Sequence, residues 1–322
     1  MRALIFTEIG KVEIGELTET AAAFGEVVVS VELVGICGSD LLGYQGRSRG
    51  RVPPLVLGHE FVGRVRDQRV VVNPIVSCGQ CEICLDGRDN LCPDMTLLGL
   101  HCHGAMRERV NVPAANVIAY AAEVPDERMA LCEPFACGLH SLELIPFRPQ
   151  TRSLVIGFGC LGSMIGCVLQ LRGAAAFDVV EPSAARRTLA GRFGGRAIEA
   201  SDVGSKQYDF VFDCAGYAET RAMSGRAVKS GGHIVLVGYG EVDGGIDFVD
   251  MVRREYHVHG VMAYTAREFR QAAEILAGGR VTLEDLVCTF PLEDGQAAFD
   301  AARACKDATI KTLLRVHAEP GT

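Results

Sequence analysis

The sequence predicts an α/β protein with two domains, one rich in short strands and one built on a doubly wound parallel sheet. Two observations predict this division. About the first 120 residues alternate apolar and polar side chains between glycine-rich turns, a pattern typical of antiparallel strands. From about residue 150 onward, short apolar runs alternate with helical patterns, as the strand, helix, strand units of a parallel sheet require. The length of 322 residues also fits two domains.

The first domain is predicted to be a barrel-like sheet. Gly10, Gly15 and Gly25 interrupt its first strands and mark turns between them. The alternating segments are residues 1–35, 62–72 and 110–117.

The second domain is predicted from runs of apolar residues without polar alternation, which indicate strands buried in a parallel sheet. The first two strands and the helix between them fit within about 30 residues, the length of one such unit. The predicted strands are residues 153–156, 177–180, 208–214 and 233–237, and the predicted helices are residues 161–171 and 219–228.

The last part of the chain is predicted to complete the first domain. A helix is expected at residues 266–277, followed by strands at 287–290 and 312–316 that flank a helix at 292–303. We therefore expect residues 1–145 and 279–322 to form one domain, with residues 146–278 inserted as the second.

Composition and charge exclude several classes of protein. The chain is 48% hydrophobic and 22% charged, as in soluble globular proteins, and its formal charge of −8 includes no basic stripe for nucleic acid. No uncharged apolar run of 18 residues occurs, and Glu8 and Lys11 interrupt any signal-like segment at the start. We expect a cytoplasmic protein with neither nucleic-acid nor membrane partners.

Four of the thirteen cysteines form a metal-binding pattern. An odd cysteine count in a chain of this length argues against a disulfide framework. The spacing C-x₂-C-x₂-C-x₇-C, among turn-forming residues, predicts a closed Cys₄ site for structural zinc. An iron–sulfur site would also favour the Cys-Pro ending but not the seven-residue gap, and four unrelated buried thiols are the other alternative. The four residues are Cys78, Cys81, Cys84 and Cys92.

Three dispersed motifs together suggest a catalytic zinc site. They contribute Cys37, the pair His59 and Glu60, and Glu133 within Cys132-Glu133-Pro134. Taken singly, a histidine is more often hydrogen-bonded in the core and a cysteine more often a small buried hydrophobe. Taken together, they offer sulfur, nitrogen and oxygen ligands, which a catalytic zinc with an open position can use.

A glycine-rich motif predicts a dinucleotide site. Residues 157–162 read G-x-G-x-x-G directly after a predicted strand and at the start of a predicted helix. The glycines permit a tight turn and close approach to a pyrophosphate, and the helix N-terminus offers free N–H groups. The candidate contacts in this motif are Gly157, Gly159, Cys160, Leu161 and Gly162.

Glu181 follows the second strand of this domain, nineteen residues after Gly162, where a carboxylate accepts hydrogen bonds from the adenosine ribose and repels a 2′-phosphate. This favours NAD over NADP. Arg186 is a further candidate contact with the cofactor, and with Arg187 it could hold a phosphate, whereas a solvated helix face is the alternative.

In this order, the motifs resemble the zinc-dependent medium-chain dehydrogenase/reductase family, most closely its polyol branch of sorbitol and threonine dehydrogenases. The motifs are Cys37-Gly38-Ser39-Asp40, Gly58-His59-Glu60, the four cysteines, Glu133-Pro134 and the glycine-rich loop. The resemblance covers essentially the whole chain. It implies a GroES-like β-barrel catalytic domain, an inserted Rossmann domain and an active site in the cleft between them.

The resemblance also assigns roles. Cys37, His59 and Glu60 fall where the polyol branch has zinc ligands, and Glu133 where it has a further ligand or water-bridged partner. Other alcohol dehydrogenases use a cysteine near this point, so Cys132 and Cys137 stay as alternatives. The remaining residues with an implied role are Ser39, which would take the alcohol proton unless it only caps a turn, and Tyr44 and His103, which would line the substrate pocket unless they are surface residues.

The implied activity is zinc-dependent oxidation of a secondary alcohol (a polyol, sugar, cyclitol or amino alcohol) with NAD. The implied cofactors are two zinc ions per subunit and NAD, and the implied assembly is a homodimer or homotetramer. Two alternatives stay open: an NADP-dependent enzyme for another class of alcohol, and a non-catalytic homologue that keeps zinc and nucleotide. The chain departs from the family at residues 65–70, where it has a short turn and members of the family usually have a longer segment.

Overall fold

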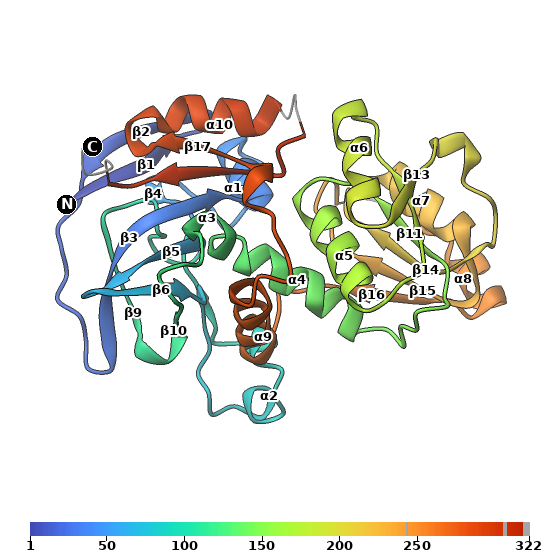
Figure 1. The fold of residues 1–322 in the computed structure, drawn as a ribbon, viewed down its shortest axis with the longest axis horizontal. Helices are drawn as coiled ribbons and strands as arrows, with labels where there is room; N and C mark the ends of the chain where they lie inside the picture. Colours follow the sequence, from blue (N-terminus) through green and yellow to red (C-terminus); the bar gives the residue numbers. More distant parts are fainter. Residues whose placement is uncertain (243, 305–307, 318–322) are drawn as a thin grey trace. The chain divides into compact units, whose positions relative to one another are not determined.

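The computed structural model describes residues 1–242, 244–304 and 308–317. These residues form two compact units (Figure 1). Unit 1 contains residues 1–133, 265–304 and 311–317, and unit 2 contains residues 134–242, 244–264 and 308–310. The division differs from the expected one at both junctions, because residues 134–145 group with unit 2 and residues 265–278 with unit 1.

Unit 1 contains three sheets whose strands are mostly antiparallel. Its strands are β1 (Arg2–Glu8), β2 (Lys11–Glu16), β3 (Glu26–Ile36), β4 (Leu55–Val56), β5 (Glu60–Val65), β6 (Gln68–Val72), β7 (Ile75–Val76), β8 (Thr96–Leu97), β9 (Arg109–Pro113), β10 (Val117–Ala119), β17 (Val287–Pro291) and β18 (Lys311–Arg315). The largest sheet has the order β10-β6-β5-β3-β18-β17, with β9 also paired to β3. The smaller sheets have the orders β2-β1-β4 and β7-β8.

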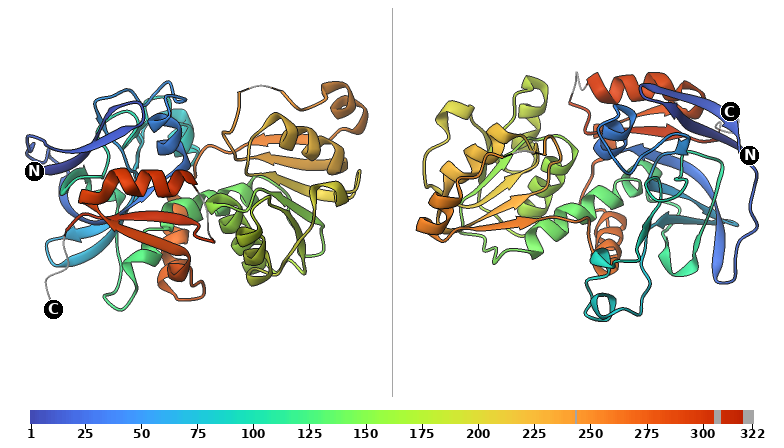
Figure 2. Two further views of the ribbon diagram at one scale, coloured as in Figure 1. Left: turned by 90° about the horizontal axis from the view of Figure 1, so that it is seen from above. Right: turned by 180° about the vertical axis from the view of Figure 1, so that it is seen from behind.

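The late strands return to this sheet, as the sequence predicts. β18 pairs antiparallel with β3, with Thr312 opposite Ile36. Figure 2 shows the last helix lying along the two late strands. The helices that lie within unit 1 are α1 (Gly38–Tyr44), α2 (Glu82–Leu85), α3 (Asp126–Met129), α9 (Ala266–Ala277) and α10 (Gly295–Ala304).

The core of unit 1 holds apolar side chains from the sheets and from α10. Phe6, Val34, Phe61 and Phe299 are all fully buried there. Removal of each such side chain from water contributes roughly 1.5–3 kcal/mol. Val29 and Val31 of β3 lie in this core and their neighbours along the strand are less buried, which explains the period of two in this part of the sequence.

Unit 2 is built on one parallel sheet of six strands in the order β13-β12-β11-β14-β15-β16. Its strands are β11 (Ser153–Ile156), β12 (Phe177–Val180), β13 (Gly195–Ala197), β14 (Tyr208–Asp213), β15 (Val228–Leu236) and β16 (His257–Gly260). Its helices are α5 (Cys160–Leu171), α6 (Ala184–Arg192), α7 (Ala218–Ala227) and α8 (Phe248–Arg254), and α4 (Cys132–Glu143) begins at the end of unit 1. Figure 1 shows α5 and α6 on one side of the strands and α7 on the other.

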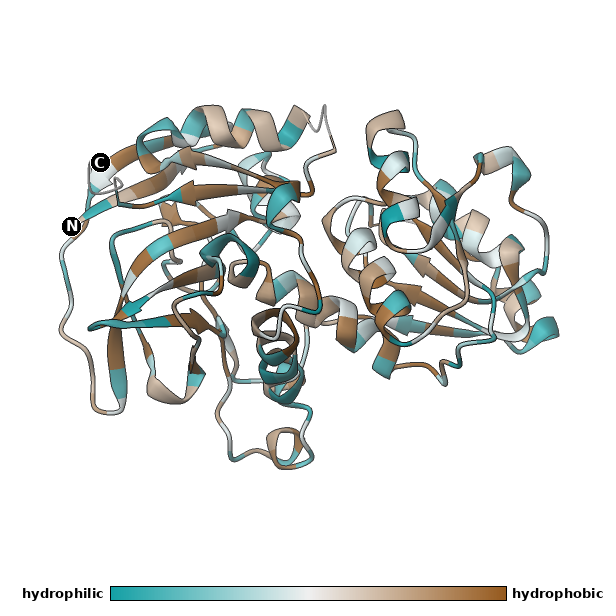
Figure 3. Ribbon diagram, viewed as in Figure 1, coloured by the Kyte–Doolittle hydropathy of each residue, from teal (hydrophilic) through white to brown (hydrophobic). Residues whose placement is uncertain are grey.

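The strand order of unit 2 reverses between β11 and β14, and ligands of such sheets bind at the carboxyl ends of the strands beside this point. Figure 3 shows the central strands β11, β12 and β14 of this sheet as largely hydrophobic, in keeping with burial on both faces. In the part of the chain that the structure describes, no helix is long and apolar enough to cross a membrane.

Candidate active site and metal centres

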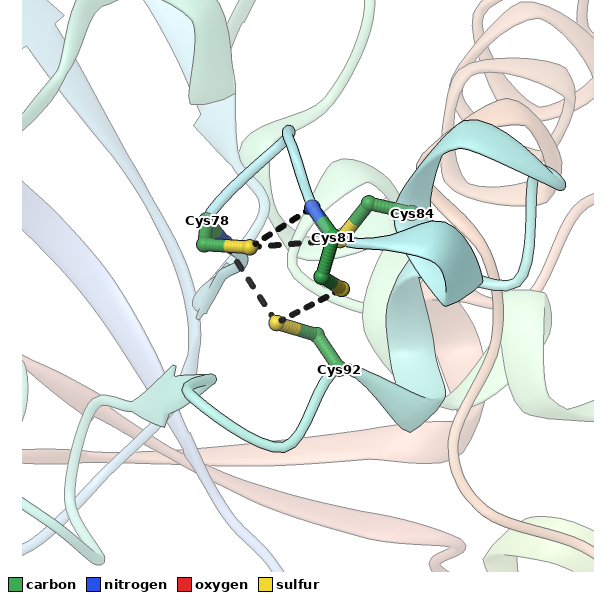
Figure 4. A group of neighbouring side chains, drawn as sticks. All are labelled: Cys78, Cys81, Cys84 and Cys92. Atoms are coloured by element: carbon green, nitrogen blue, oxygen red, sulfur yellow. Dashed lines mark hydrogen bonds between the residues drawn. The ribbon is translucent and has the colours of Figure 1, made fainter.

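The four spaced cysteines come together in unit 1 (Figure 4). Cys78 Sγ lies 3.9 Å from Cys84 Sγ, and Cys81 Sγ lies 3.9 Å from Cys92 Sγ. These sulfurs are too far apart for disulfides. Zn–S bonds of about 2.3 Å in a tetrahedron would place the sulfurs about 3.8 Å apart. The spacing therefore fits one zinc ion.

Backbone N–H groups stabilise the negatively charged thiolate form of one of these cysteines. The amides of Gln80 and Cys81 lower the pKa of Cys78 to about 7, whereas burial raises the pKa of Cys84 to about 12. Four thiolates this close would repel one another without a positive ion between them. We call residues 78–92 the cysteine lobe. It contacts α9, because the Asp89 carboxylate accepts the backbone N–H of Ala266 with N···O distances of 3.0 and 3.2 Å.

A second group consists of Cys37, His59 and Glu60, whose ligand atoms all lie within 4.8 Å of one another. The pairing of β3 with β5 explains this, since Gly35 lies opposite Glu60 in the register. Cys37 follows the end of β3 and His59 precedes β5, so the antiparallel pair brings them together. A Cβ at residue 35 would lie 2.3 Å from Glu60 Oε2, so the carboxylate occupies space that only a glycine leaves.

The donor atoms of this second group fit a divalent cation. Glu60 Oε1 accepts a hydrogen bond from the buried Lys311 ammonium at 2.7 Å. Glu60 Oε2 is buried and has no hydrogen-bond partner among the described residues. Asp40 Oδ1 lies 3.5 Å from His59 Nδ1, which is buried and forms no hydrogen bond among the described residues, and either ring nitrogen can serve as a ligand. A thiolate, an imidazole and a carboxylate are ligands that zinc accepts in catalytic sites.

The charges around Asp40 favour its ionised form. Burial would raise the pKa of Asp40, but His59, Arg51 and the Cys37 amide lower it to about 2. Burial would lower the pKa of His59, but Asp40 and the Cys37 thiolate raise that pKa well above its ordinary value. The surroundings of the His59 imidazole therefore favour a positive charge. Without a metal ion, a proton on the ring supplies this charge, and a metal ion supplies it when it takes the place of that proton.

Glu133 is not one of the residues whose ligand atoms gather within 4.8 Å of one another. It is the second residue of α4 and is buried, but the three ligand atoms that gather are those of Cys37, His59 and Glu60. Cys132 Sγ lies 3.7 Å from the Phe269 carbonyl oxygen, and burial raises the pKa of this thiol well above its ordinary value. Cys132 is therefore placed as a core thiol.

Ser39 lies in the first turn of α1, and its Oγ accepts a hydrogen bond from Arg51 Nη2 at 3.0 Å. The two residues that the resemblance places in the substrate pocket, Tyr44 and His103, form hydrogen bonds with backbone groups. Tyr44 is buried in the core, where its hydroxyl donates to the Gly10 carbonyl oxygen at 2.6 Å. His103 is exposed, and its Nδ1 accepts the Val56 N–H at 3.1 Å.

In unit 2, the glycine-rich motif forms the turn between β11 and α5, at the reversal of strand order. Gly159 is the N-cap residue of α5, so Cys160 and Leu161 present their N–H groups at the helix N-terminus. A Cβ at Gly162 would lie 2.0 Å from the Gly157 carbonyl oxygen, which a side chain would clash with. The turn has the close packing that a dinucleotide site needs.

Glu181 secures this turn from the end of β12. Its Oε2 accepts the Phe158 N–H at 2.6 Å and its Oε1 accepts the Ser183 N–H at 2.9 Å. Each oxygen keeps a second lone pair for a ribose hydroxyl. Arg186 Nη1 lies close to Gly159, 3.5 Å from where a Cβ would be, whereas Arg187 pairs with Glu199. The two arginines therefore differ, and only Arg186 lies against the glycine-rich turn.

Comparison with known proteins identifies the family. The model of the alcohol dehydrogenase GroES-like domain matches residues 23–126, and that of the zinc-binding dehydrogenase domain matches residues 160–278. An uncharacterized zinc-type alcohol dehydrogenase-like protein of Escherichia coli (strain K12) is 30% identical, over 90% of this chain and 92% of its own. The chain belongs to the zinc-dependent medium-chain alcohol and polyol dehydrogenases. It is a zinc-type, NAD(P)-linked alcohol oxidoreductase.

Relatives with defined activities support this assignment. The sorbitol dehydrogenase of Bacillus subtilis (strain 168) is 28% identical, over 98% of this chain and 97% of its own. An alcohol dehydrogenase of Escherichia coli CFT073, solved in complex with NADH, has 25% identity and a TM-score of 0.89, covering 98% of this chain and 99% of its own. The GroES-like and Rossmann folds expected from the sequence are thus confirmed.

The sequence did not predict three buried residues of the candidate site, namely Asp40, Arg51 and Lys311. Asp40 could have been found, because it stands directly after Ser39 in the motif. Arg51 and Lys311 carry no such signal, since they are far from the ligands along the chain and reach them only through the fold.

Proposed function

We propose that Cys37, His59 and Glu60 hold the catalytic zinc, that the cysteine lobe holds a structural zinc, and that the enzyme oxidises secondary alcohols of polyols, sugars or related compounds with NAD. The observation that carries this proposal is the convergence of one ligand atom each from Cys37, His59 and Glu60, with Glu60 Oε2 buried and unpartnered among the described residues. Zinc, when bound, acts as a Lewis acid that lowers the pKa of an alcohol, and NAD accepts the hydride.

The chain's own residues position and neutralise this centre. Asp40 lies beside the imidazole of His59 and balances its charge, and Lys311 holds Glu60 through Oε1, which leaves Oε2 without a partner among the described residues. Ser39 Oγ accepts the alcohol proton and passes it towards solvent. Glu133 is the labile partner, displaced or bridged by water when the substrate oxygen binds.

We infer that NAD is the preferred dinucleotide, because the Glu181 carboxylate at the end of β12 repels a 2′-phosphate. Gly157, Gly159, Cys160, Leu161 and Gly162 form the turn around the pyrophosphate, and Arg186 contacts a phosphate. The position of Arg186, with a buried Nε that has no hydrogen-bond partner among the described residues, favours NADP as the second candidate.

The experiment is to follow reduction of NAD⁺ and NADP⁺ by absorbance with vicinal polyols, sugars, cyclitols and amino alcohols, using protein with its full zinc. We expect turnover with one structural class and a kcat/KM for NAD⁺ at least about tenfold above that for NADP⁺, a difference of about 1.4 kcal/mol. Glu181→Gln should reduce the ratio of kcat/KM for NAD⁺ to kcat/KM for NADP⁺. A preference for NADP⁺ would contradict the cofactor assignment, and cofactor binding without turnover on any alcohol would favour a non-catalytic homologue.

The expected cytoplasmic location and the homodimeric or homotetrameric assembly stay predictions. Size-exclusion chromatography with light scattering tests the assembly.

A further inference from the structure

Arg51 is a buried arginine with two partners beside the candidate zinc ligands. It is 6% exposed, and its Nε donates to Asp40 Oδ1 at 3.2 Å while its Nη2 donates to Ser39 Oγ at 3.0 Å. Asp40 in turn accepts the Cys37 N–H at 3.1 Å through Oδ2. One guanidinium thus links the proposed proton acceptor, Ser39, to the carboxylate that faces His59.

The helix α1 leaves a space for this arginine. A Cβ at Gly43 would lie 2.6 Å from Arg51 Cδ and 2.8 Å from Arg51 Cβ, so the arginine stem passes directly over this glycine. A buried arginine is costly unless it is paired and hydrogen-bonded, and Asp40 and Ser39 provide both. The fold therefore accommodates this side chain at one place and in one orientation.

The chemistry of the guanidinium determines what Ser39 can do. Arginine only donates hydrogen bonds, so Ser39 Oγ is the acceptor in this contact and its own hydrogen points away from Arg51. The contact also selects one of the three staggered rotamers of the serine. We propose that Arg51 is a positioning residue of the dehydrogenase, which holds Ser39 in the orientation that takes the alcohol proton.

This inference rests on the proposed role of Ser39, and the competing view is that Arg51 only stabilises the fold through Asp40. The two differ in a double-mutant cycle. If Arg51 acts through Ser39, its loss costs little once Ser39 is gone; if it acts only through Asp40, its cost is the same with or without Ser39.

The experiment compares Arg51→Met, Ser39→Ala and the double variant, with kcat and KM for the alcohol at saturating cofactor, zinc content by mass spectrometry, and thermal unfolding. We expect each single variant to lower kcat by about 10- to 100-fold, because misplacement of a reacting group by 1 Å can cost about 100-fold. The double variant should have the kcat of Ser39→Ala, zinc content should stay at the parent level, and the KM for cofactor should not change.

Two further variants keep the test decisive if Arg51→Met folds poorly. Gly43→Ala displaces the arginine stem without changing any charge, and should lower kcat in the parent but not in the Ser39→Ala background. Arg51→Lys should recover part of the lost kcat, since an ammonium can also donate to Oγ. Arg49→Gln, at an exposed arginine of the same loop, is the matched control and should leave kcat unchanged.

The outcomes separate this inference from the proposed function. Multiplicative losses in the double variant, or a loss of zinc that accounts for the drop in kcat, would overturn the positioning role while leaving Ser39 as the proton acceptor. Parent activity in Ser39→Ala would overturn the proton-accepting role itself, and the positioning role with it.

Discussion

Glu60 and Glu133 are two buried carboxylates with different surroundings. Glu60 accepts a hydrogen bond from Lys311 through Oε1, has an unpartnered Oε2 among the described residues, and contributes a carboxylate oxygen to the group formed with Cys37 and His59. Glu133 does not belong to that group. With a thiolate, a neutral imidazole and one carboxylate, the charge of the Zn²⁺ site sums to zero, and a second carboxylate would make it negative and weaken its Lewis acidity. The charges therefore favour Glu60 as the permanent ligand and Glu133 as the labile one.

We predict that Glu133→Ala lowers kcat by about 10- to 100-fold while zinc content stays at the parent level, because partners outside the permanent ligands tune activity by about this much. Zinc is measured by mass spectrometry and kcat with the preferred alcohol. Glu143→Ala, on the exposed end of α4, is the matched control and should change neither. Equal loss of zinc and of activity in Glu133→Ala would identify Glu133 as a permanent ligand.

Among single residues, the sequence identifies those that belong to a short, recognisable motif. Cys37, His59 and Glu60 stand in short motifs, and the structure brings them together. Arg51 and Lys311 act through contacts between segments, which spacing along the chain does not encode. Tyr44 was expected to line the pocket or lie at the surface, but its ring packs against Phe299 in the core, with ring centroids 5.1 Å apart.

At the scale of elements, the cysteine lobe depends on a metal because it has little secondary structure of its own. α2 has only four residues, and the cysteine sulfurs bring residues from both ends of the lobe together. The lobe also reaches α9, where Asp89 accepts the first N–H of the helix. An acidic side chain at a helix N-terminus stabilises the helix by typically 0.3–1 kcal/mol.

We predict that Cys84→Ser makes the lobe sensitive to trypsin, with the first cut after the exposed Arg88, because a site with one ligand lost no longer closes the segment. Limited proteolysis with mass spectrometry identifies the cut, and metal analysis should show one zinc ion fewer per chain. Cys102→Ser, at a cysteine outside both metal groups, is the control and should resist trypsin like the parent. Parent-like resistance in Cys84→Ser would show that the lobe folds without metal.

Some elements were predictable and others were not, for physical reasons. α9 has the predicted bounds, because its amphipathic pattern coincides with a capping box formed by Thr265 and Glu268. β15 begins at Val228, five residues before the strand predicted at 233–237, because parallel pairing with β14 extends the strand over polar residues. The bounds of α6 were not predicted, since six of its nine residues are alanine or arginine and give no clear apolar stripe.

At the scale of the molecule, metal and cofactor residues separate between the two units. The cysteine lobe, Cys37, His59, Glu60 and Glu133 belong to unit 1, and the glycine-rich turn with Glu181 and Arg186 belongs to unit 2. Each unit carries its own hydrophobic pattern, so the fold class was predictable. The boundaries between the units were harder to predict. α9 groups with unit 1, where Asp89 and Cys132 contact it, and both residues are far from α9 along the chain.

This separation predicts that cofactor binding does not require zinc. The turn at Gly157–Gly162 is held by Glu181 and by close packing within unit 2, so removal of metal from unit 1 leaves its geometry unchanged. Protein treated with a chelator and freed of zinc should bind NADH with a Kd within about threefold of the parent, or about 0.6 kcal/mol, while alcohol oxidation is lost. NADH fluorescence titration measures the Kd.

The matched variant is Gly162→Val, whose side chain would clash with the Gly157 carbonyl oxygen, 2.0 Å from the position of a Cβ. It should abolish NADH binding while the zinc content stays at the parent level, which is the reverse of the result with chelator. A bound cofactor at 100 times its Kd adds about 2.7 kcal/mol to stability, so its thermal shift should persist without zinc in the parent and vanish in Gly162→Val. Loss of NADH binding together with zinc would instead show that binding of the cofactor is coupled to binding of the metal.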